Sequence, residues 1–329
     1  LILNEKVWEG RLSWPAITEW LENFTGRVSD TDTERLHALF WLSQFMYFGE
    51  REIRVLLKSM YRDLFLYPII QEVRSKLPTN ATESEIEAVI RDELKHTRFI
   101  GVGNSSESGV HLLYYFRQEN NLAKKLFVDS EQIFTRSPDK SLSWIKKAIN
   151  VIASLVGANT LRLREPTVRR YVFIDDICGS GDTTIDSTRK ILSELKAMNP
   201  VAKVAYYSLF ATKKGLKLVE ENSLFGSNCG AVYELDTSYR CLSNTSRYLK
   251  VVPYEINCDL AVNLVKEYGN LLDPLYACGW KDSQMLIGFH HNTPDNTIGI
   301  IWHDSLVNGG ATSWKPVFKR YPKIYGESL

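Results

Sequence analysis

Cysteines are few in this sequence, and none is spaced to hold a metal or to build a disulfide framework. The five cysteines are scattered over 329 residues, and no C-x-x-C pair occurs among them. This spacing argues against a zinc site and against a small disulfide-stabilised fold. A sparse, odd set of cysteines is typical of a reducing compartment, so we expect a cytoplasmic protein.

Long apolar runs and a strong excess of one charge are also missing. No apolar run approaches the ~20 residues that a membrane-spanning helix needs, and no signal peptide opens the sequence, so we expect no membrane partner. The 40 basic and 39 acidic residues leave a net charge of +1, which gives no overall reason to expect nucleic acid, although a local patch could still bind it. Because the sequence begins at Leu1 rather than Met, we expect the natural terminus to lie upstream.

The first part of the chain, residues 1–96, has the pattern of a helical region. Apolar residues recur at helical spacing, and Thr31 with Glu34 and Thr82 with Glu85 have the spacing of a capping box. Such apolar stripes are usually core. We therefore interpret residues 1–96 as a helical region that packs and carries no chemistry.

From residue 97 onward, strand and helix patterns alternate. This alternation favours an α/β fold with a mostly parallel sheet flanked by helices, in which ligands bind beyond the carboxyl ends of the strands. Two glycine-containing loops, 101–109 and 175–184, lie at such ends. Strands are predicted over 98–103, 124–129, 169–176, 202–211, 230–236, 283–291 and 297–304, and helices over 108–120, 141–157, 182–198 and 258–272.

The most informative stretch is YVFIDDICGSGDTTI, residues 171–185. An apolar strand ends in Asp175 and Asp176, whose adjacent carboxylates repel each other and need hydrogen-bond donors or positive charge. A sugar diol supplies donors, and Mg²⁺ supplies charge. The glycines of the following loop let backbone N–H groups converge, and the helix starting near Asp182 aims its positive end at the same place. Phosphate contacts are expected from Gly179, Ser180, Gly181, Asp182, Thr183 and Thr184.

Other phosphate and acidic motifs fit this stretch less well. The Walker pattern is absent, and a dinucleotide-binding G-x-G-x-x-G would need glycine at Thr184. A phosphatase-type D-x-D would need an acid at Ile177. A receiver domain also has paired aspartates after a strand, but it lacks the loop of glycines and hydroxyls. A chance strand–turn–helix is the remaining alternative.

The segment YVFIDDICGSGDTT resembles the phosphoribosyl pyrophosphate signature of type I phosphoribosyltransferases: four apolar residues, two acids, two apolar residues and a small-residue loop ending in Thr or Ser. The resemblance implies ribose-hydroxyl contacts for Asp175 and Asp176, with Mg²⁺ as cofactor, and 5′-phosphate contacts for residues 179–184. Two departures stand out. Gly179 replaces an aspartate that purine-using members carry, and Asp182 opposes a phosphate unless it meets a cation.

A second loop is expected to hold the pyrophosphate, because in the resembled fold this loop follows an earlier strand. The segment FIGVGNSSESGV suits that place. Its proposed contacts are Ser105, Ser106, Ser108 and Gly109. The alternative is an ordinary serine-rich turn that caps a helix.

The carboxyl-terminal part narrows the resemblance. Residues 279–305 and 309–320 are similar to the closing segment of phosphoribosyltransferase-like effector proteins of bacterial conflict systems, some of which are retron-associated. This implies a hood over residues 240–329, in which His290, His291, Asn292 and Asn296 contact the acceptor. Trp280 or Trp302 would stack on its base. The alternative for residues 290–296 is a plain connecting turn.

The sequence thus predicts a type I phosphoribosyltransferase-like domain over residues 97–329, following the helical region. Its expected function is glycosyl transfer or cleavage at C1 of phosphoribosyl pyrophosphate or a nucleotide, in an antiviral effector. The alternative is a nucleotide-sensing or docking module without turnover. Expected partners are a reverse transcriptase–nucleic acid complex or another protein of a defence operon, and an oligomer is compatible with the sequence.

Overall fold

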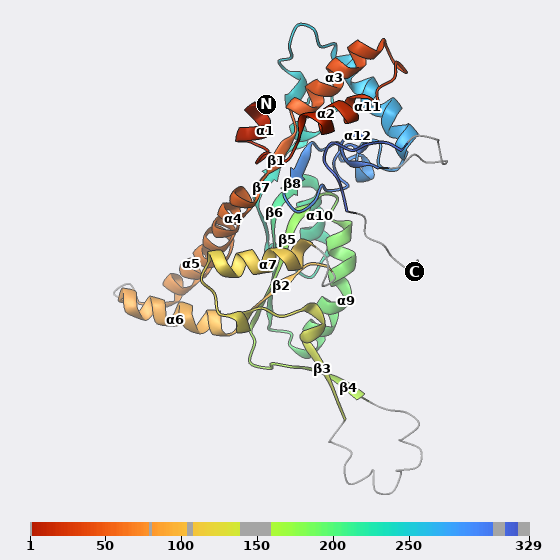
Figure 1. Ribbon diagram of the computed structural model, residues 1–329. Helices are drawn as coiled ribbons and strands as arrows, with labels where there is room; N and C mark the ends of the chain where they lie inside the picture. The colour runs from red at the N-terminus through yellow and green to blue at the C-terminus, as the bar shows by residue number, and fades with distance from the viewer. Residues whose placement is uncertain (1, 79–80, 104–107, 139–158, 305–312, 322–329) are drawn as a thin grey trace, which may run out of the picture.

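Four parallel strands form the centre of the protein, in the order β2-β5-β6-β7 (Figure 1). The structure, a computed structural model, describes residues 2–78, 81–103, 108–138, 159–304 and 313–321. The predicted α/β fold with a mostly parallel sheet flanked by helices is confirmed. The strands are β2 (Thr97–Gly101), β5 (Arg170–Cys178), β6 (Lys203–Thr212) and β7 (Cys229–Leu235).

Helices cover both faces of this sheet, because its central strands are apolar on both sides. In β5, Val172 and Ile174 face one layer of helices, whereas Tyr171 and Phe173 belong to the core on the other face. The first layer contains α4 (Glu50–Ser59), a π-helix (Met60–Leu66), α5 (Tyr67–Lys76) and α7 (Ser108–Glu119), with α6 (Glu83–Lys95) packed on α5. The second contains α9 (Asp182–Met198) and α10 (Lys213–Asn222).

A separate lobe lies over one end of the sheet and joins the two ends of the chain (Figure 1). Its short parallel pair couples β1 (Met46–Phe48) to β8 (Ile287–Phe289). We call this lobe the hood, since it includes the predicted hood residues. Its helices are α1 (Ile2–Lys6), α2 (Trp14–Leu21), α3 (Thr31–Ser43), α11 (Cys258–Leu272) and α12 (Gly299–Trp302), with short 3-10 turns at Thr237–Tyr239, Arg247–Leu249 and Trp280–Asp282.

The packing therefore divides the first 96 residues between two parts of the protein. Buried residues up to Tyr47 belong to the hood core, whereas Met46, Phe48 and the buried residues from Ile53 onward pack on the sheet. The predicted capping box at Thr82 and Glu85 is confirmed. The one at Thr31 and Glu34 is wrong: Asp30 caps α3, and the buried Glu34 accepts a hydrogen bond from the hydroxyl of Tyr268 at 2.6 Å.

Two predicted strands are wrong, and one predicted helix is not tested. Residues 124–129 contribute a 3-10 turn, Lys124–Leu126, and a single bridge to β2 rather than a strand. Residues 299–302 form α12 rather than a strand, and the helix predicted over 141–157 lies outside the described residues. A second 3-10 turn, Ser130–Gln132, precedes an antiparallel pair, β3 (Phe134–Pro138) and β4 (Asn159–Leu163). Within the described residues, no helix is long and apolar enough to cross a membrane.

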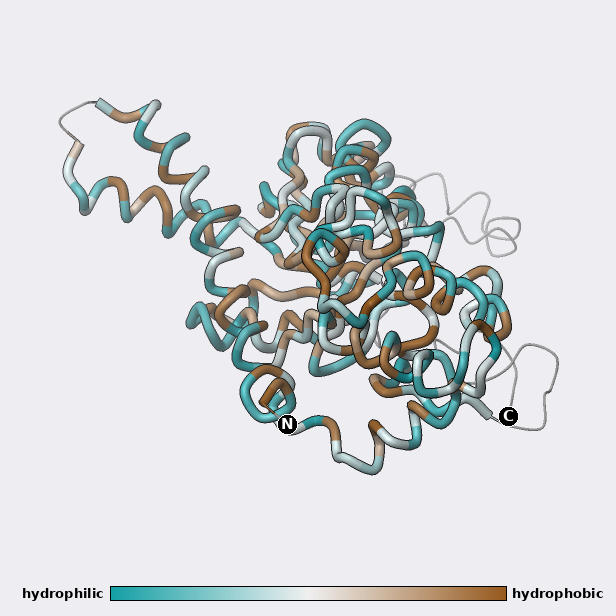
Figure 2. The backbone as a smooth tube through the Cα atoms, turned by 90° about the horizontal axis from the view of Figure 1, so that it is seen from above, coloured by the Kyte–Doolittle hydropathy of each residue, from teal (hydrophilic) through white to brown (hydrophobic). Residues whose placement is uncertain are grey.

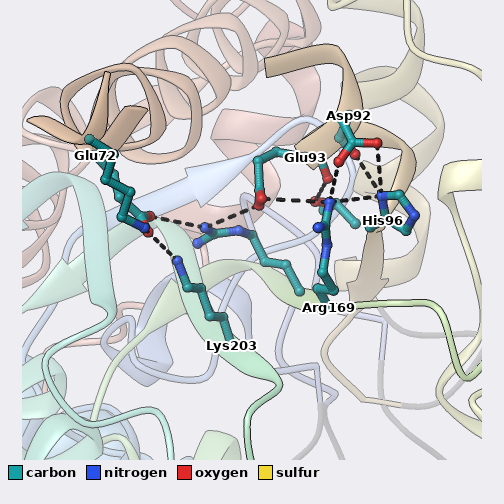
Figure 3. Close-up of polar contacts among 9 residues, drawn as sticks. Glu72, Asp92, Glu93, His96, Arg169 and Lys203 are labelled. Atoms are coloured by element: carbon teal, nitrogen blue, oxygen red, sulfur yellow. Dashed lines mark hydrogen bonds and ion pairs between the residues drawn. The ribbon is translucent and has the colours of Figure 1, made fainter. Parts of the chain in front are cut away.

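Seen from above, the apolar stretches of the chain gather toward the middle, and the paired α5 and α6 project to one side (Figure 2). An ion network fastens this pair to the amino ends of the central strands (Figure 3). Glu72 of α5 contacts Lys203, at the start of β6, and lies 3.5 Å from Arg170 at the start of β5. From α6, Asp92 and Glu93 contact Arg169, which also lies 2.9 Å from His96. The network lies at the opposite end of the strands from their carboxyl termini.

The central acid of this network gives a test of acid stability. Hydrogen bonds from Lys203 and Lys76 lower the pKa of Glu72 to about 2. A lowered pKa means that the contribution to stability is complete above the ordinary pKa of the group and is lost as the pH falls through the folded value. Because Glu72 is about one-third exposed, at 34%, we expect Glu72→Gln to lower the unfolding free energy at pH 7 by only about 1 kcal/mol.

Urea unfolding at pH 7 and pH 3.5 measures this difference, which should shrink at the lower pH. Glu87→Gln is the matched control, since Glu87 makes an exposed pair with Arg91 at 3.5 Å. A Glu72→Gln variant as stable as the wild type at pH 7 would show that the network does not hold the helical pair.

Candidate functional site

A cavity of about 120 Å³ lies at the carboxyl end of the sheet, between the loop after β5 and the hood. It brings together the acidic pair, the glycine loop and three polar residues from residues 290–296 of the hood. Its wall also includes Val102, just after β2, and the aromatic residues Trp280 and Phe289. The polar lining comprises Asp175, Asp176, Gly179, Ser180, Gly181, Thr183, Thr184, Asn292, Asp295, Asn296 and Arg320.

The acidic pair ends the buried part of β5, and its two carboxylates have different partners. Successive side chains of a strand alternate between its faces. Asp175 accepts a hydrogen bond from the hydroxyl of Tyr206 at 3.1 Å, on the face covered by α9 and α10. Asp176 lies 3.1 Å from Nε2 of His291, which comes from the hood just after β8. One acid is thus tied to the sheet and the other to the hood.

The electrostatics of Asp175 follow from this confinement. Its removal from water raises the pKa well above the ordinary value, and the neighbouring carboxylate of Asp176 raises it further. Hydrogen bonds from Tyr206 and from the amide of Asp176 act in the other direction and lower the pKa. A diol or a cation placed in the cavity would stabilise the ionised form.

The glycine loop places the beginning of α9 beside the acidic pair. Gly181 has a φ of +89°, a left-handed conformation that favours glycine. Residues Asp182, Thr183 and Thr184 are the first of the helix, where backbone N–H groups have no partner within the helix. Among the described residues, the amides of Thr183 and Thr184 have no acceptor, and both residues line the cavity. This arrangement suits an anion.

Asp182 meets a cation, as the sequence requires if a phosphate is to bind beside it. Its carboxylate lies 2.6 Å from Nζ of Lys281 in the hood, and this contact lowers the pKa of Asp182. Lys281 and its neighbours Asp282 and Gln284 have positive φ values, which are uncommon for residues other than glycine. The hood segment is therefore held in an unusual conformation that carries its lysine to the loop.

A second hood residue, Asn296, packs against Gly179. A side chain added at Gly179 would meet Nδ2 of Asn296 at 2.1 Å, and one added at Gly181 would meet the carbonyl oxygen of Gly215 at 2.7 Å. Thr212, at the end of β6, donates its hydroxyl to the carbonyl oxygen of Gly179 at 2.6 Å. Glycine is required here because hood, loop and α10 meet.

The structure brings most of the predicted hood residues to the cavity, with one exception. Asn292 and Asn296 line it, and His291 reaches it through Asp176. His290 instead packs against His291 and Tyr115, and both of its ring nitrogens are buried without a hydrogen bond in the described part of the chain. Burial, and then the nearby His291, lower its pKa to about 4.

Of the two predicted stacking tryptophans, Trp280 lines the cavity. Trp302 donates its indole N–H to the carbonyl oxygen of Thr297 at 2.8 Å in the hood core. Sequence reasoning missed Arg320, which lines the cavity while bonding the carboxylate of Asp295 at 2.9 Å. An isolated arginine near a chain end has no local signal.

The predicted pyrophosphate loop is described only in part. Ser105 and Ser106 lie outside the described residues, and Ser108 is the first residue of α7. A side chain added at Gly109 would lie 2.6 Å from the carbonyl oxygen of Val102. Glycine at this position allows α7 to approach the ends of β2 and β5 closely.

A second cavity, of about 280 Å³, lies on the other side of the glycine loop. The two cavities share Gly179, Ser180 and Trp280. Leu218, Leu235, Tyr239 and Met285 give the second cavity an apolar lining, and Lys213 and Lys214 stand at the beginning of α10. The loop is therefore accessible from two sides.

The two acidic residues alone do not make a protein metal site. No group of three or more metal-ligating side chains occurs in the described part of the chain. Mg²⁺ prefers six oxygen ligands and commonly takes several of them from water and substrate phosphates. The donor set therefore fits an ion shared with a phosphorylated ligand.

Comparison with known proteins assigns the chain to one family. The PRTase-CE family model matches residues 17–320. No curated protein matches the chain. Among solved structures, the Helicobacter pylori xanthine-guanine-hypoxanthine phosphoribosyltransferase is 10% identical, over 58% of this chain and 92% of that chain, with a TM-score of 0.23. Because this TM-score is low, the assignment of the chain to a family rests on the family model.

The contact between hood and loop can be tested at Gly179. We expect Gly179→Ala to lower the unfolding free energy by about 1–3 kcal/mol, because the added methyl group overpacks against Asn296. Urea unfolding would measure it. Since Asn296→Ala removes the obstructing amide, the second substitution should recover most of the loss. An equal cost in both backgrounds would contradict the contact.

Proposed function

The chain belongs to the PRTase-CE family, and on this premise we propose that it acts on a ribose 5-phosphate compound. The substrate is phosphoribosyl pyrophosphate or a nucleotide, and the reaction transfers or cleaves the glycosyl group at C1. The proposal is supported most by one observation: Asp175, Asp176 and the amino end of α9 line a single cavity.

The cavity offers a matching group for each part of such a ligand. The carboxylates of Asp175 and Asp176 accept hydrogen bonds from the ribose hydroxyls. The amides of Thr183 and Thr184, which have no acceptor in the described part of the chain, stand at the positive end of α9 and receive the 5′-phosphate. The guanidinium of Arg320 also lines the cavity, where it is paired with the carboxylate of Asp295.

The chain's contribution to the reaction is binding, orientation and exclusion of water. Departure of a group from C1 leaves positive charge on the sugar, and fixed carboxylates near the ring stabilise charge of that sign. Phe289, Trp280 and Pro294 give the cavity apolar walls, which strengthen these interactions. A bound Mg²⁺ would neutralise the leaving pyrophosphate, with Asp175 and Asp176 as its protein ligands.

The base or acceptor is proposed to enter the second cavity, because it adjoins the first along Gly179 and Ser180. Trp280 borders both cavities and can stack on a flat ring. Lys213 and Lys214 can donate hydrogen bonds to its exocyclic oxygens. Asn292 and Asn296 can then contact the sugar side of the acceptor.

A second candidate function is a nucleotide-sensing or docking module without turnover. It is favoured by the contacts of the hood, since His291 occupies Asp176 and Asn296 covers Gly179. A ligand that displaces these contacts would shift the hood and signal its presence. In either case we propose an antiviral role beside a defence partner, which rests on the resemblance of the closing segment.

Asp176 tests the sugar site directly. Asp176→Asn should weaken the binding of phosphoribosyl pyrophosphate by about 1–3 kcal/mol, because it replaces charge-assisted hydrogen bonds with neutral ones. Isothermal titration in the presence of Mg²⁺ measures the change. Asp186→Asn is the control, since Asp186 lies on the exposed side of α9 and pairs with Arg189. Equal affinity of wild type and Asp176→Asn would remove the diol assignment.

Turnover separates the enzyme from the module. If the protein is an enzyme, incubation with phosphoribosyl pyrophosphate or nucleotides and Mg²⁺ should release pyrophosphate or free base, and Asp175→Asn should abolish the release. Chromatography of the products measures both. Ligand binding without product, combined with loss of phage protection in cells carrying Asp175→Asn, would favour the module.

A further inference from the structure

A buried tyrosine lies directly beneath the candidate site. Tyr206 of β6 is 0% exposed, and its ring packs at 5.7 Å from that of Phe225. Its hydroxyl is surrounded by protein, so it must find hydrogen-bond partners or lose about 1–3 kcal/mol. Its oxygen partners, Asp175 and Thr184, belong to the site, and the thiol of Cys178 is a further neighbour.

The hydroxyl of Tyr206 links two parts of the site that are otherwise separate. It donates to Oδ2 of Asp175 at 3.1 Å and accepts from the hydroxyl of Thr184 at 3.2 Å. Thr184 is the third residue of α9, only 3% exposed, and its backbone carbonyl accepts from Thr188 at 2.6 Å. The Thr184 hydroxyl is thus committed inward, which leaves the Thr184 amide as the group available to a ligand.

All three groups point their hydrogen bonds in one direction. Thr184 donates to Tyr206, and Tyr206 donates to Asp175, so each bond polarises the next. The remaining oxygen of Asp175, Oδ1, accepts from the amide of Asp176 at 3.0 Å. With both oxygens engaged, the carboxylate plane of Asp175 is fixed relative to the amino end of α9.

We infer that Tyr206 is a positioning residue, which turns Asp175 toward the sugar hydroxyls and couples that orientation to the phosphate-binding end of α9 through Thr184. This inference rests on the proposed function. Tyr206 does not line the cavity, so it acts through Asp175 and touches no ligand.

The neighbouring residue provides a matched control. Tyr207 is also buried, at 9% exposed, but its side chain belongs to the core on the opposite face of the sheet. Removing a hydroxyl from either tyrosine leaves the aromatic packing intact. Only Tyr206→Phe removes a donor from Asp175.

The experiment compares two ligands that differ only in the diol. Ribose 5-phosphate and 2,3-dideoxyribose 5-phosphate are titrated calorimetrically into the wild-type protein, Tyr206→Phe and Tyr207→Phe. We expect the wild type and Tyr207→Phe to prefer the ribose form by at least ~10-fold, and Tyr206→Phe by no more than ~3-fold, since a hydrogen bond to a charged group carries that much affinity. Affinity for the dideoxy form should stay the same in all three.

Substitutions of Thr184 test the same chain of hydrogen bonds while Tyr206 remains unchanged. Thr184→Val should lower the ribose preference as Tyr206→Phe does, Thr184→Ser should restore it, and the double variant should be no worse than Tyr206→Phe. Independent, additive losses would overturn the coupling.

The remaining outcomes separate the two proposals. A wild type with no preference for the ribose form would overturn the proposed sugar site, and this inference with it. A wild type that prefers ribose, with a Tyr206→Phe variant that prefers it equally, would overturn the positioning role alone. Equal loss of both affinities in Tyr206→Phe would also overturn it, because a purely structural role affects both ligands alike.

Discussion

The repulsion between two adjacent, poorly solvated carboxylates is the constraint on which the rest of this structure depends. Asp175 and Asp176 take different protein partners, because neighbouring residues of a strand point to opposite faces. The protein satisfies one from the sheet, through Tyr206, and the other from the hood, through His291. The pair therefore joins the layers of the fold at one point, and a diol or cation that binds there acts on all of them.

The sheet and the glycine loop could be predicted from the sequence because their signals are local. Four apolar residues, two acids and a glycine-broken loop are consecutive, and the helix that follows begins at Asp182 as expected. The parallel direction of β2, β5 and β6 follows from strands that alternate with helices. The conformation of Gly181 is the physical reason that the loop contains glycine, and it too is a local property.

The hood could be predicted only in outline, because its contacts join residues far apart in the chain. Glu34 has the spacing of a helix cap, yet it is bonded to Tyr268, 234 residues away. His290 and His291 look equivalent in the sequence, and only the path of β8 beside β1 turns one toward Asp176 and the other toward Tyr115. Arg320 reaches the cavity because the last described segment folds back over Thr293. Propensity and periodicity carry none of this information.

The strengths of the hood contacts suggest how a ligand would be exchanged. Lys281 and Asp182 are 51% and 38% exposed in their side chains, so their pairing contributes little to stability and opens at small cost. His291 and Asp176 are both only 10% exposed, and separating them without a replacement would cost the buried Nε2 of His291 its hydrogen bond to Asp176. A sugar hydroxyl can supply that replacement, whereas water held in a narrow, partly apolar cavity does so less well. The hood is therefore fastened loosely at Asp182, beside the glycine loop, and more firmly at Asp176.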